Sequence, residues 1–170
     1  MKYVVKVERK RNLVEVISNL GGEGVSKCIQ CGSCMSVCPV TLVGFDYPNK
    51  KLFKFVQMGE EDPLLSDPSP WACVACGRCI EVCSQDVNPF SVYFALRRLQ
   101  VRGFRIHLLA KEAVGSIYES GHAIFLDNSE EREKFGLPEV SSAAKSKKDL
   151  NEIREILRSS DISDLGILPR

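Results

Sequence analysis

Two runs of cysteines constrain this 170-residue chain more than any other feature of its sequence. Both runs have the spacing C-x2-C-x2-C-x3-C, and the second repeats the first 45 residues later. Together they contain all eight cysteines of the chain, which are Cys28, Cys31, Cys34 and Cys38 in the first run and Cys73, Cys76, Cys79 and Cys83 in the second. Gly32 and Gly77 repeat at the same offset. Chance placement does not produce a repeat of this kind.

The spacing is typical of bacterial-type ferredoxins that bind two 4Fe–4S clusters. Two-residue gaps allow three thiolates of one run to reach three corners of a cubane, and the fourth cysteine of each run ligates the other cluster. We therefore expect crossed ligand sets, with one cluster bound by Cys28, Cys31, Cys34 and Cys83 and the other by Cys73, Cys76, Cys79 and Cys38. Gly32 and Gly77 are expected to let the backbone pass close to each cluster.

Two other uses of the cysteines fit the sequence less well. Residues 1–10 are charged from the start, unlike a secretory signal, so a disulfide framework is not favoured. Structural zinc sites combine separate C-x2-C pairs, whereas each run here supplies a third and a fourth cysteine. A zinc-stabilised interaction protein without a redox role stays an alternative, which colour would distinguish because iron–sulfur proteins are brown.

Composition and charge exclude several partner classes. The formal net charge is +1, so nucleic acid is not expected as a partner. No apolar run approaches the ~20 residues that span a bilayer, so we expect a soluble, cytoplasmic protein without a membrane span. Residues 87–111 lack acidic side chains and carry five basic ones, Arg97, Arg98, Arg102, Arg105 and Lys111. This stretch is either a solvated helix face or a docking surface for an acidic partner.

Hydrophobic periodicity predicts a mainly helical chain. Helices are expected at 8–20, 49–59, 90–101, 105–118 and 149–158. Asn88-Pro89 and Gly103 mark the two ends of the third of these helices, because asparagine caps helix starts and proline fits the first helical position. A weak alternation predicts a strand at 2–7. Residues 60–70 are expected to form a proline-containing loop, and Pro39 is expected to end a short helix.

These patterns favour an α-helical ferredoxin-like domain with extra N- and C-terminal helices, rather than the βαβ repeat of small ferredoxins. The predicted divisions are an N-terminal strand and helix at 1–22, the cluster-binding domain at 23–120, and a polar extension at 121–170. The extension is expected to contain a linker near 141–148 and to end in an extended tail. Trp71, two residues before the second run, is predicted to pack over a cluster and exclude water.

The chain resembles the C subunit of heterodisulfide reductase over about residues 10–140. The resemblance is carried by the segments 28–40, 52–59, 71–83, 117–122 and 134–138. One departure is Ser84, where many members of this family have proline after the last cysteine of the second run. Because proline does not ligate iron, we expect the cluster to form regardless.

The resemblance implies an electron-transfer role. In that family two 4Fe–4S clusters relay electrons between the flavin-containing A subunit of the complex and its catalytic B subunit, which acts on the mixed disulfide of coenzymes M and B or on a related sulfur substrate. It further implies that this chain works in a hetero-oligomer with A-like and B-like subunits of heterodisulfide reductase. The alternative is the iron–sulfur module of another respiratory complex, of the succinate dehydrogenase or glycolate oxidase type.

The residues give no indication of catalysis by this chain alone. All eight cysteines are assigned as cluster ligands, so none is left for thiol–disulfide exchange. The remaining acid–base candidates near neutral pH are His107 and His122, which we interpret as structural or surface residues. We therefore expect no catalytic residues and a role in electron transfer.

Overall fold

The computed structural model describes residues 12–45, 49–123, 129–138 and 146–169. Within these ranges the chain is helical and has no strand, so the prediction of a mainly α protein is confirmed. The strand predicted at 2–7 and most of the predicted linker lie outside the described residues. The chain forms two compact units, Met1–Arg105 and Ile106–Arg170. The division predicted after residue 120 therefore differs from the boundary between these units.

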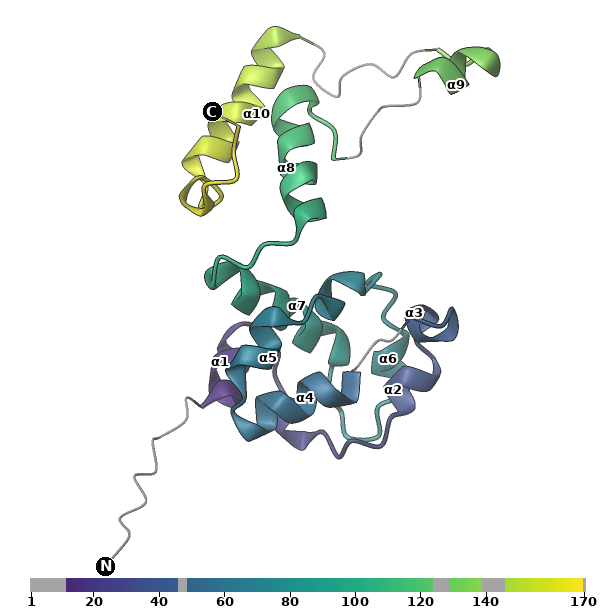
Figure 1. Cartoon of the computed structure of the whole chain (residues 1–170), viewed down its shortest axis with the longest axis vertical. Helices are drawn as coiled ribbons and strands as arrows, with labels where there is room; N and C mark the ends of the chain where they lie inside the picture. The colour runs from purple at the N-terminus through teal and green to yellow at the C-terminus, as the bar shows by residue number, and fades with distance from the viewer. Residues whose placement is uncertain (1–11, 46–48, 124–128, 139–145, 170) are drawn as a thin grey trace, which may run out of the picture. The chain divides into compact units, whose positions relative to one another are not determined.

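Unit 1 contains both cysteine runs. Its elements in chain order are α1 (Leu13–Asn19), η1 (Val25–Lys27), α2 (Ser33–Ser36), α3 (Pro39–Leu42), α4 (Asn49–Met58), α5 (Glu61–Ser66), η2 (Ser69–Ala72), α6 (Arg78–Glu81) and α7 (Pro89–Arg102), where η denotes a 3₁₀ turn. The short helices α2 and α6 each lie inside a cysteine run. Figure 1 shows α2 and α6 side by side, next to α3.

The core of unit 1 is built by α1, α4 and α7. Each contributes an apolar stripe with helical spacing, and the buried members are Leu13, Ile17, Leu52, Phe53, Val56, Val92, Tyr93, Ala95, Leu96 and Leu99. The rings of Phe53 and Tyr93 lie 5.6 Å apart between α4 and α7. The apolar residues of α7 are thus mostly buried inside unit 1.

Local signals placed the ends of α7 correctly. The Asn88 side chain accepts a hydrogen bond from the Ser91 N–H at 3.0 Å, Pro89 is the first helical residue, and Gly103 follows the last. A close approach explains a second glycine: a Cβ on Gly22 would lie 2.6 Å from the Ile17 side chain and 2.9 Å from that of Ala95. This glycine lets the end of α1 pack directly on α7.

Proline positions account for two errors in the predicted elements. The segment 60–70 is not a loop, because it contains α5 and the start of η2. Pro63 is the third residue of α5, where a backbone N–H has no acceptor within the helix, so proline is tolerated. Pro39 does not merely end a helix; it is the first residue of α3.

A buried glutamine connects α7 to the segment before the second run. Gln100 is 2% exposed. Its Nε2 donates to the carbonyls of Leu64 and Asp67, each at 2.7 Å, and its Oε1 accepts from Trp71 Nε1 at 2.6 Å. Both polar atoms of the amide are therefore satisfied by residues of the segment from α5 to η2.

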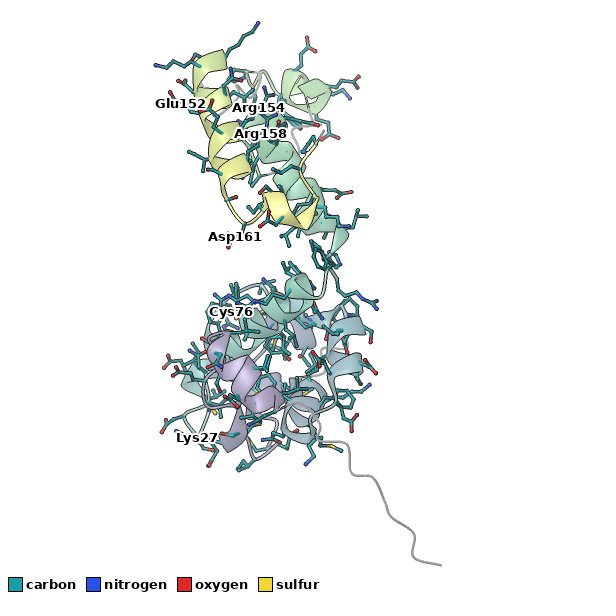
Figure 2. The ribbon with its side chains drawn as sticks, turned by 90° about the vertical axis from the view of Figure 1, so that its left-hand side faces the viewer. Lys27, Cys76, Glu152, Arg154, Arg158 and Asp161 are labelled. Atoms are coloured by element: carbon teal, nitrogen blue, oxygen red, sulfur yellow. The ribbon has the colours of Figure 1, made fainter. Side chains whose placement is uncertain are left out.

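Unit 2 contains α8 (Leu108–Ser120), α9 (Ser129–Lys134), α10 (Lys147–Ser159) and η3 (Ser163–Leu165). The predicted extended tail is interrupted by η3. Helix α10 packs against α8, and Figure 2 shows Arg154 and Arg158 on it. Arg154 donates to the Tyr118 carbonyl at 2.9 Å, Arg158 donates to the Tyr118 hydroxyl, and both guanidinium groups lie over the tyrosine ring. One aromatic residue thus anchors α10.

We predict that Gln100→Leu destabilises unit 1. The substitution leaves buried carbonyls and the Trp71 N–H without partners, which should lower the free energy of unfolding by about 2–3 kcal/mol. Urea denaturation under anaerobic conditions, followed by circular dichroism, measures this change. Lys54→Gln on the exposed side of α4 is the control and should change stability by less than about 0.5 kcal/mol. Equal stabilities of the two variants would contradict the role of Gln100.

Candidate metal centres

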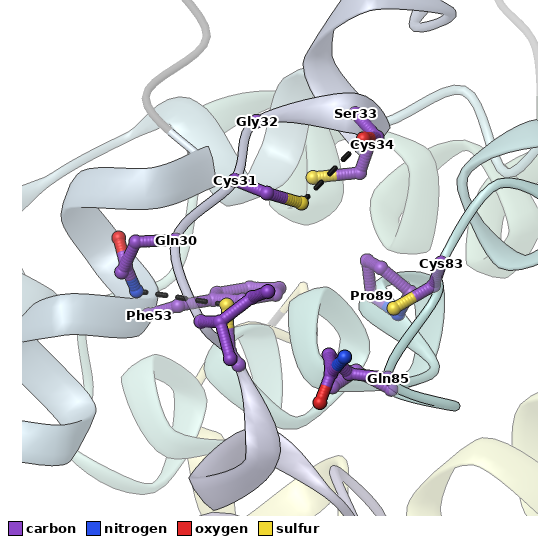
Figure 3. Close-up of a pocket in the computed structure, with 12 residues that line it drawn as sticks. Gln30, Cys31, Gly32, Ser33, Cys34, Phe53, Cys83, Gln85 and Pro89 are labelled. Atoms are coloured by element: carbon purple, nitrogen blue, oxygen red, sulfur yellow. Dashed lines mark hydrogen bonds between the residues drawn. The ribbon is translucent and has the colours of Figure 1, made fainter.

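The first cysteine run surrounds a cavity in unit 1. Figure 3 shows Cys31 and Cys34 on one side of this space and Cys83 on another, with Phe53 and Pro89 also on its wall. The cysteines that line the cavity are Cys28, Cys31, Cys34 and Cys83. Its remaining lining is largely apolar, including Phe53, Val87 and Pro89.

A second cavity has the complementary set of cysteines. It is lined by Cys38, Cys73, Cys76 and Cys79, together with Val40, Phe90 and Tyr93. Each cavity therefore combines three cysteines of one run with the last cysteine of the other. The crossed ligand rule groups the cysteines in the same way, and the ligation itself stays a prediction.

The two runs have the same backbone conformation at matching positions. Gly32 and Gly77 adopt left-handed φ angles of 88° and 76° and precede α2 and α6. A Cβ on Gly77 would meet no protein atom within 4 Å, so the left-handed backbone, and not crowding by the protein, requires glycine there. Gln30 and Ala75 are also left-handed, at 63° and 57°. The sequence repeat is thus a repeat of loop geometry.

Side chains reach the sulfur atoms in the first cavity. Gln30 Nε2 donates to Cys28 Sγ at 3.6 Å, and the Ser33 hydroxyl lies 3.5 Å from Cys31 Sγ. The matching positions in the second run are Ala75 and Arg78, and the alanine side chain has no donor. Donors to ligand sulfurs tune iron–sulfur centres, so the two cavities offer different environments.

Burial and mutual repulsion disfavour thiolates here unless a cation is bound. Burial, with further contributions from the nearby thiols of Cys28 and Cys79, raises the pKa of Cys34 to about 11. Burial also raises the pKa of Cys79, and Cys73 adds to this increase. Iron must therefore displace protons from these thiols, and its positive charge compensates the repulsion between the resulting thiolates.

The two cavities are neighbours. Cys34 lies in α2 and Cys79 in α6, and these helices pack against each other. Cys79 is close enough to raise the pKa of Cys34. The third cysteine of each run thus lies on the side where the cavities meet.

Trp71 and the two histidines lie apart from the residues that line the cavities. Trp71 is half-buried, donates to Gln100 and packs beside the guanidinium of Arg97, so it supports α7 instead of covering a cavity. His107 caps α8 by accepting from the Leu109 N–H at 3.3 Å, and His122 follows the end of that helix. Both histidines belong to unit 2, whereas the cysteines belong to unit 1.

The described residues offer no other evident metal site. Among them, the structure contains no disulfide and no group of three or more His, Cys, Asp or Glu side chains arranged to hold a single metal ion. None of the helices in the described ranges is both long and apolar enough to cross a membrane.

Comparison with known proteins identifies the family. Residues 24–87 match the 4Fe-4S dicluster domain, a segment that includes all eight cysteines. The chain is 45% identical over 165 residues to the C-like subunit of heterodisulfide reductase from Archaeoglobus profundus, covering 96% of this chain and 88% of that protein. The chain belongs to the heterodisulfide reductase C-subunit family.

More distant members of the heterodisulfide reductase C-subunit family also align. The C subunit of the H(2):CoB-CoM heterodisulfide,ferredoxin reductase of Methanothermobacter thermautotrophicus is 28% identical over 156 residues, which cover 89% of this chain and 83% of that protein. The C subunit of the ferredoxin:CoB-CoM heterodisulfide reductase of Methanosarcina acetivorans is 28% identical over 88 residues, or 51% of this chain and 35% of that protein.

The cavities fit the cofactors of this member of the heterodisulfide reductase C-subunit family. The family match and the cysteines around two apolar cavities identify two 4Fe–4S clusters as its cofactors. Sequence reasoning found all eight cysteines, because their spacing alone indicates this chemistry. It missed Gln30 and Ser33, whose contacts with sulfur depend on the left-handed turn at Gln30.

We predict that the anaerobically purified chain contains about eight iron and about eight sulfide per monomer. The reason is the set of four cysteines around each cavity. Iron and sulfide assays on reconstituted protein measure the content. A stable preparation with about four irons would contradict two cubane clusters.

We further predict that Cys38→Ser damages the cluster held by the second run more than the one held by the first. Cys38 lines the second cavity although it belongs to the first run. Electron paramagnetic resonance of the reduced protein separates the two signals. Selective loss of the cluster near Cys28, Cys31 and Cys34 would show that the ligands are not crossed.

Proposed function

We propose that this chain is the electron-transfer subunit of a heterodisulfide-reductase-type complex. Its proposed cluster ligands are Cys28, Cys31, Cys34 and Cys83 for the first cluster and Cys73, Cys76, Cys79 and Cys38 for the second. When bound, the clusters supply one-electron redox chemistry. Unit 1 is proposed to be an α-helical ferredoxin-like domain that holds them.

The observation that carries this proposal is that two cysteine-lined cavities lie side by side. The packing of α2 on α6 brings Cys34 near Cys79, so two centres in these cavities are close enough for electrons to pass between them. All eight cysteines line one cavity or the other, which leaves no thiol for direct attack on a disulfide. The chain therefore conducts electrons, and a partner performs the substrate chemistry.

The proposed partners are two proteins of the same complex, one a flavin-containing A-like protein and the other a catalytic B-like protein. The names of two relatives describe reductases of the CoB-CoM heterodisulfide, which supports a disulfide or a related sulfur compound as the substrate of the complex. The chain would relay electrons between the two partner proteins.

Exposed apolar residues beside the cavities mark where these partners would dock. Ile29 and Val74 each follow the first cysteine of a run and are 60% and 63% exposed. The second cysteines of the runs, Cys31 and Cys76, are exposed on the same loops. Because electron transfer needs short distances, a partner centre must approach at these loops. The basic stretch contributes less than its sequence implies, because Arg97 binds backbone carbonyls within unit 1.

We predict that a tagged chain isolated from its native cells copurifies with a flavoprotein and with another, cysteine-rich protein. Mass spectrometry identifies these partners, and the reduced complex should be reoxidised by a disulfide substrate. Copurification with a succinate dehydrogenase or glycolate oxidase flavoprotein would replace the proposal by that alternative. A monomeric chain that retains both clusters and associates with neither would contradict it.

We also predict that Ile29→Glu and Val74→Glu weaken complex formation while both clusters remain. A charge at either position opposes burial against an apolar partner surface. Pull-down yield and iron content are the two measurements. Ile156→Glu is the matched control, because Ile156 is 66% exposed on α10 in unit 2. Yields equal to that of the control would place the docking surface elsewhere.

A further inference from the structure

The backbone before the first cysteine run is held by one glutamine from α4. Gln57 Nε2 donates to the carbonyl oxygens of Val25, Ser26 and Cys28, at 3.1, 3.4 and 2.8 Å. These carbonyls belong to η1 and to the first cysteine that follows it. The last carbonyls of a helical turn have no partner within the turn, so the side chain satisfies groups that would otherwise need water.

An arginine from a different helix makes the same contacts with the second run. Arg97 of α7 donates from Nε to the Pro70 carbonyl at 2.8 Å, and from Nη2 to the carbonyls of Trp71 and Cys73 at 3.3 and 2.7 Å. Pro70, Trp71 and Cys73 stand 45 residues after Val25, Ser26 and Cys28, the same offset that relates the cysteines. The two side chains therefore bind equivalent oxygens in the two runs.

The bound backbone segments also have the same shape. Cys28 has φ −64° and ψ 115°, and Cys73 has φ −63° and ψ 119°. Each cysteine ends a 3₁₀ turn and lines its cavity. Fixing the carbonyl of this cysteine fixes the direction of its Cβ, and hence the position of its sulfur.

The two side chains differ in charge. Gln57 is neutral, whereas Arg97 carries a full positive charge at the backbone of a cavity-lining cysteine. The guanidinium is held in place by two aromatic rings, with its central carbon 5.4 Å from the Trp71 ring centre and 4.6 Å from that of Phe94. Lys27 and Arg78 lie next to cysteines of the first and second run, but both are exposed, so water screens them.

We propose that Gln57 and Arg97 are equivalent positioning residues for the two clusters, and that Arg97 additionally raises the reduction potential of the cluster that Cys73 ligates. A fixed positive charge favours the reduced state, because reduction makes the cluster more negative. The chain thus uses one geometric device twice and changes its charge in one of the two places.

Arg97→Gln and Arg97→Lys separate the two parts of this proposal. Both substitutions alter the contacts with the carbonyls, but lysine keeps the charge. Redox titration followed by electron paramagnetic resonance should show a lower midpoint potential for one cluster in Arg97→Gln and a smaller change in Arg97→Lys. The cluster is assigned to the second run with Cys76→Ser, whose oxygen ligand alters that signal.

Arg98→Gln is the matched control. Arg98 is the next residue on α7, but it donates to the Leu20 carbonyl at 2.5 Å and is exposed. Its loss removes the same charge and should leave both midpoint potentials unchanged. Equal shifts in Arg97→Gln and Arg98→Gln, or no shift in either, would overturn the electrostatic role. Each comparison is made for the same cluster against wild type, so the contact of Gln30 with Cys28 does not enter.

Gln57 provides an independent test if Arg97→Gln loses a cluster. Gln57→Lys places a charge at the neutral position and should raise the midpoint potential of the first cluster alone. An unchanged potential with both clusters retained would overturn the proposal. Gln57→Leu removes the donor and should release iron from the first cavity faster than from the second, measured with an iron chelator under anaerobic conditions. Equal release from both cavities would contradict the positioning role.

Discussion

The packing of α7 is the interaction on which unit 1 depends. This helix contacts α1, α5, α6 and η2, and its buried face supplies Val92, Leu96 and Leu99 to the core. It begins soon after the last cysteine of the second run, so its position also fixes where that run ends. Gln100 and Arg97 extend from it to the segment before the run. One helix therefore joins the hydrophobic core to the second cavity.

The repeated cysteine loops are supported by elements that do not repeat. The first loop rests on α4 through Gln57, and the second on α7 through Arg97. Equal loop geometry thus arises from two different helices, because the requirement lies in the carbonyls that need donors and not in the helix that supplies them. This division allows the loops to keep the shape that the clusters need while their surroundings differ in charge.

Features that depend on short-range chemistry were predictable from the sequence. The cysteine spacing identified the cysteines that line each cavity, and Asn88-Pro89 located the start of α7, because capping involves only neighbouring residues. Features that depend on contacts between distant segments were not. Helix α5 was hidden by Pro63, and Arg97 was grouped with exposed basic residues because its acceptors lie more than 20 residues earlier in the chain. Only the fold brings such partners together.

The exchange of a cysteine between the two runs has a consequence for how the protein is made. The first cavity is completed by Cys83, which leaves the ribosome after the whole first run, helix α4 and helix α5. At typical translation rates this delay is on the order of seconds. A nascent chain thus presents the first three thiols before the fourth exists. Cluster delivery to this protein must accordingly wait for the second run or use a carrier that supplies the missing ligand meanwhile.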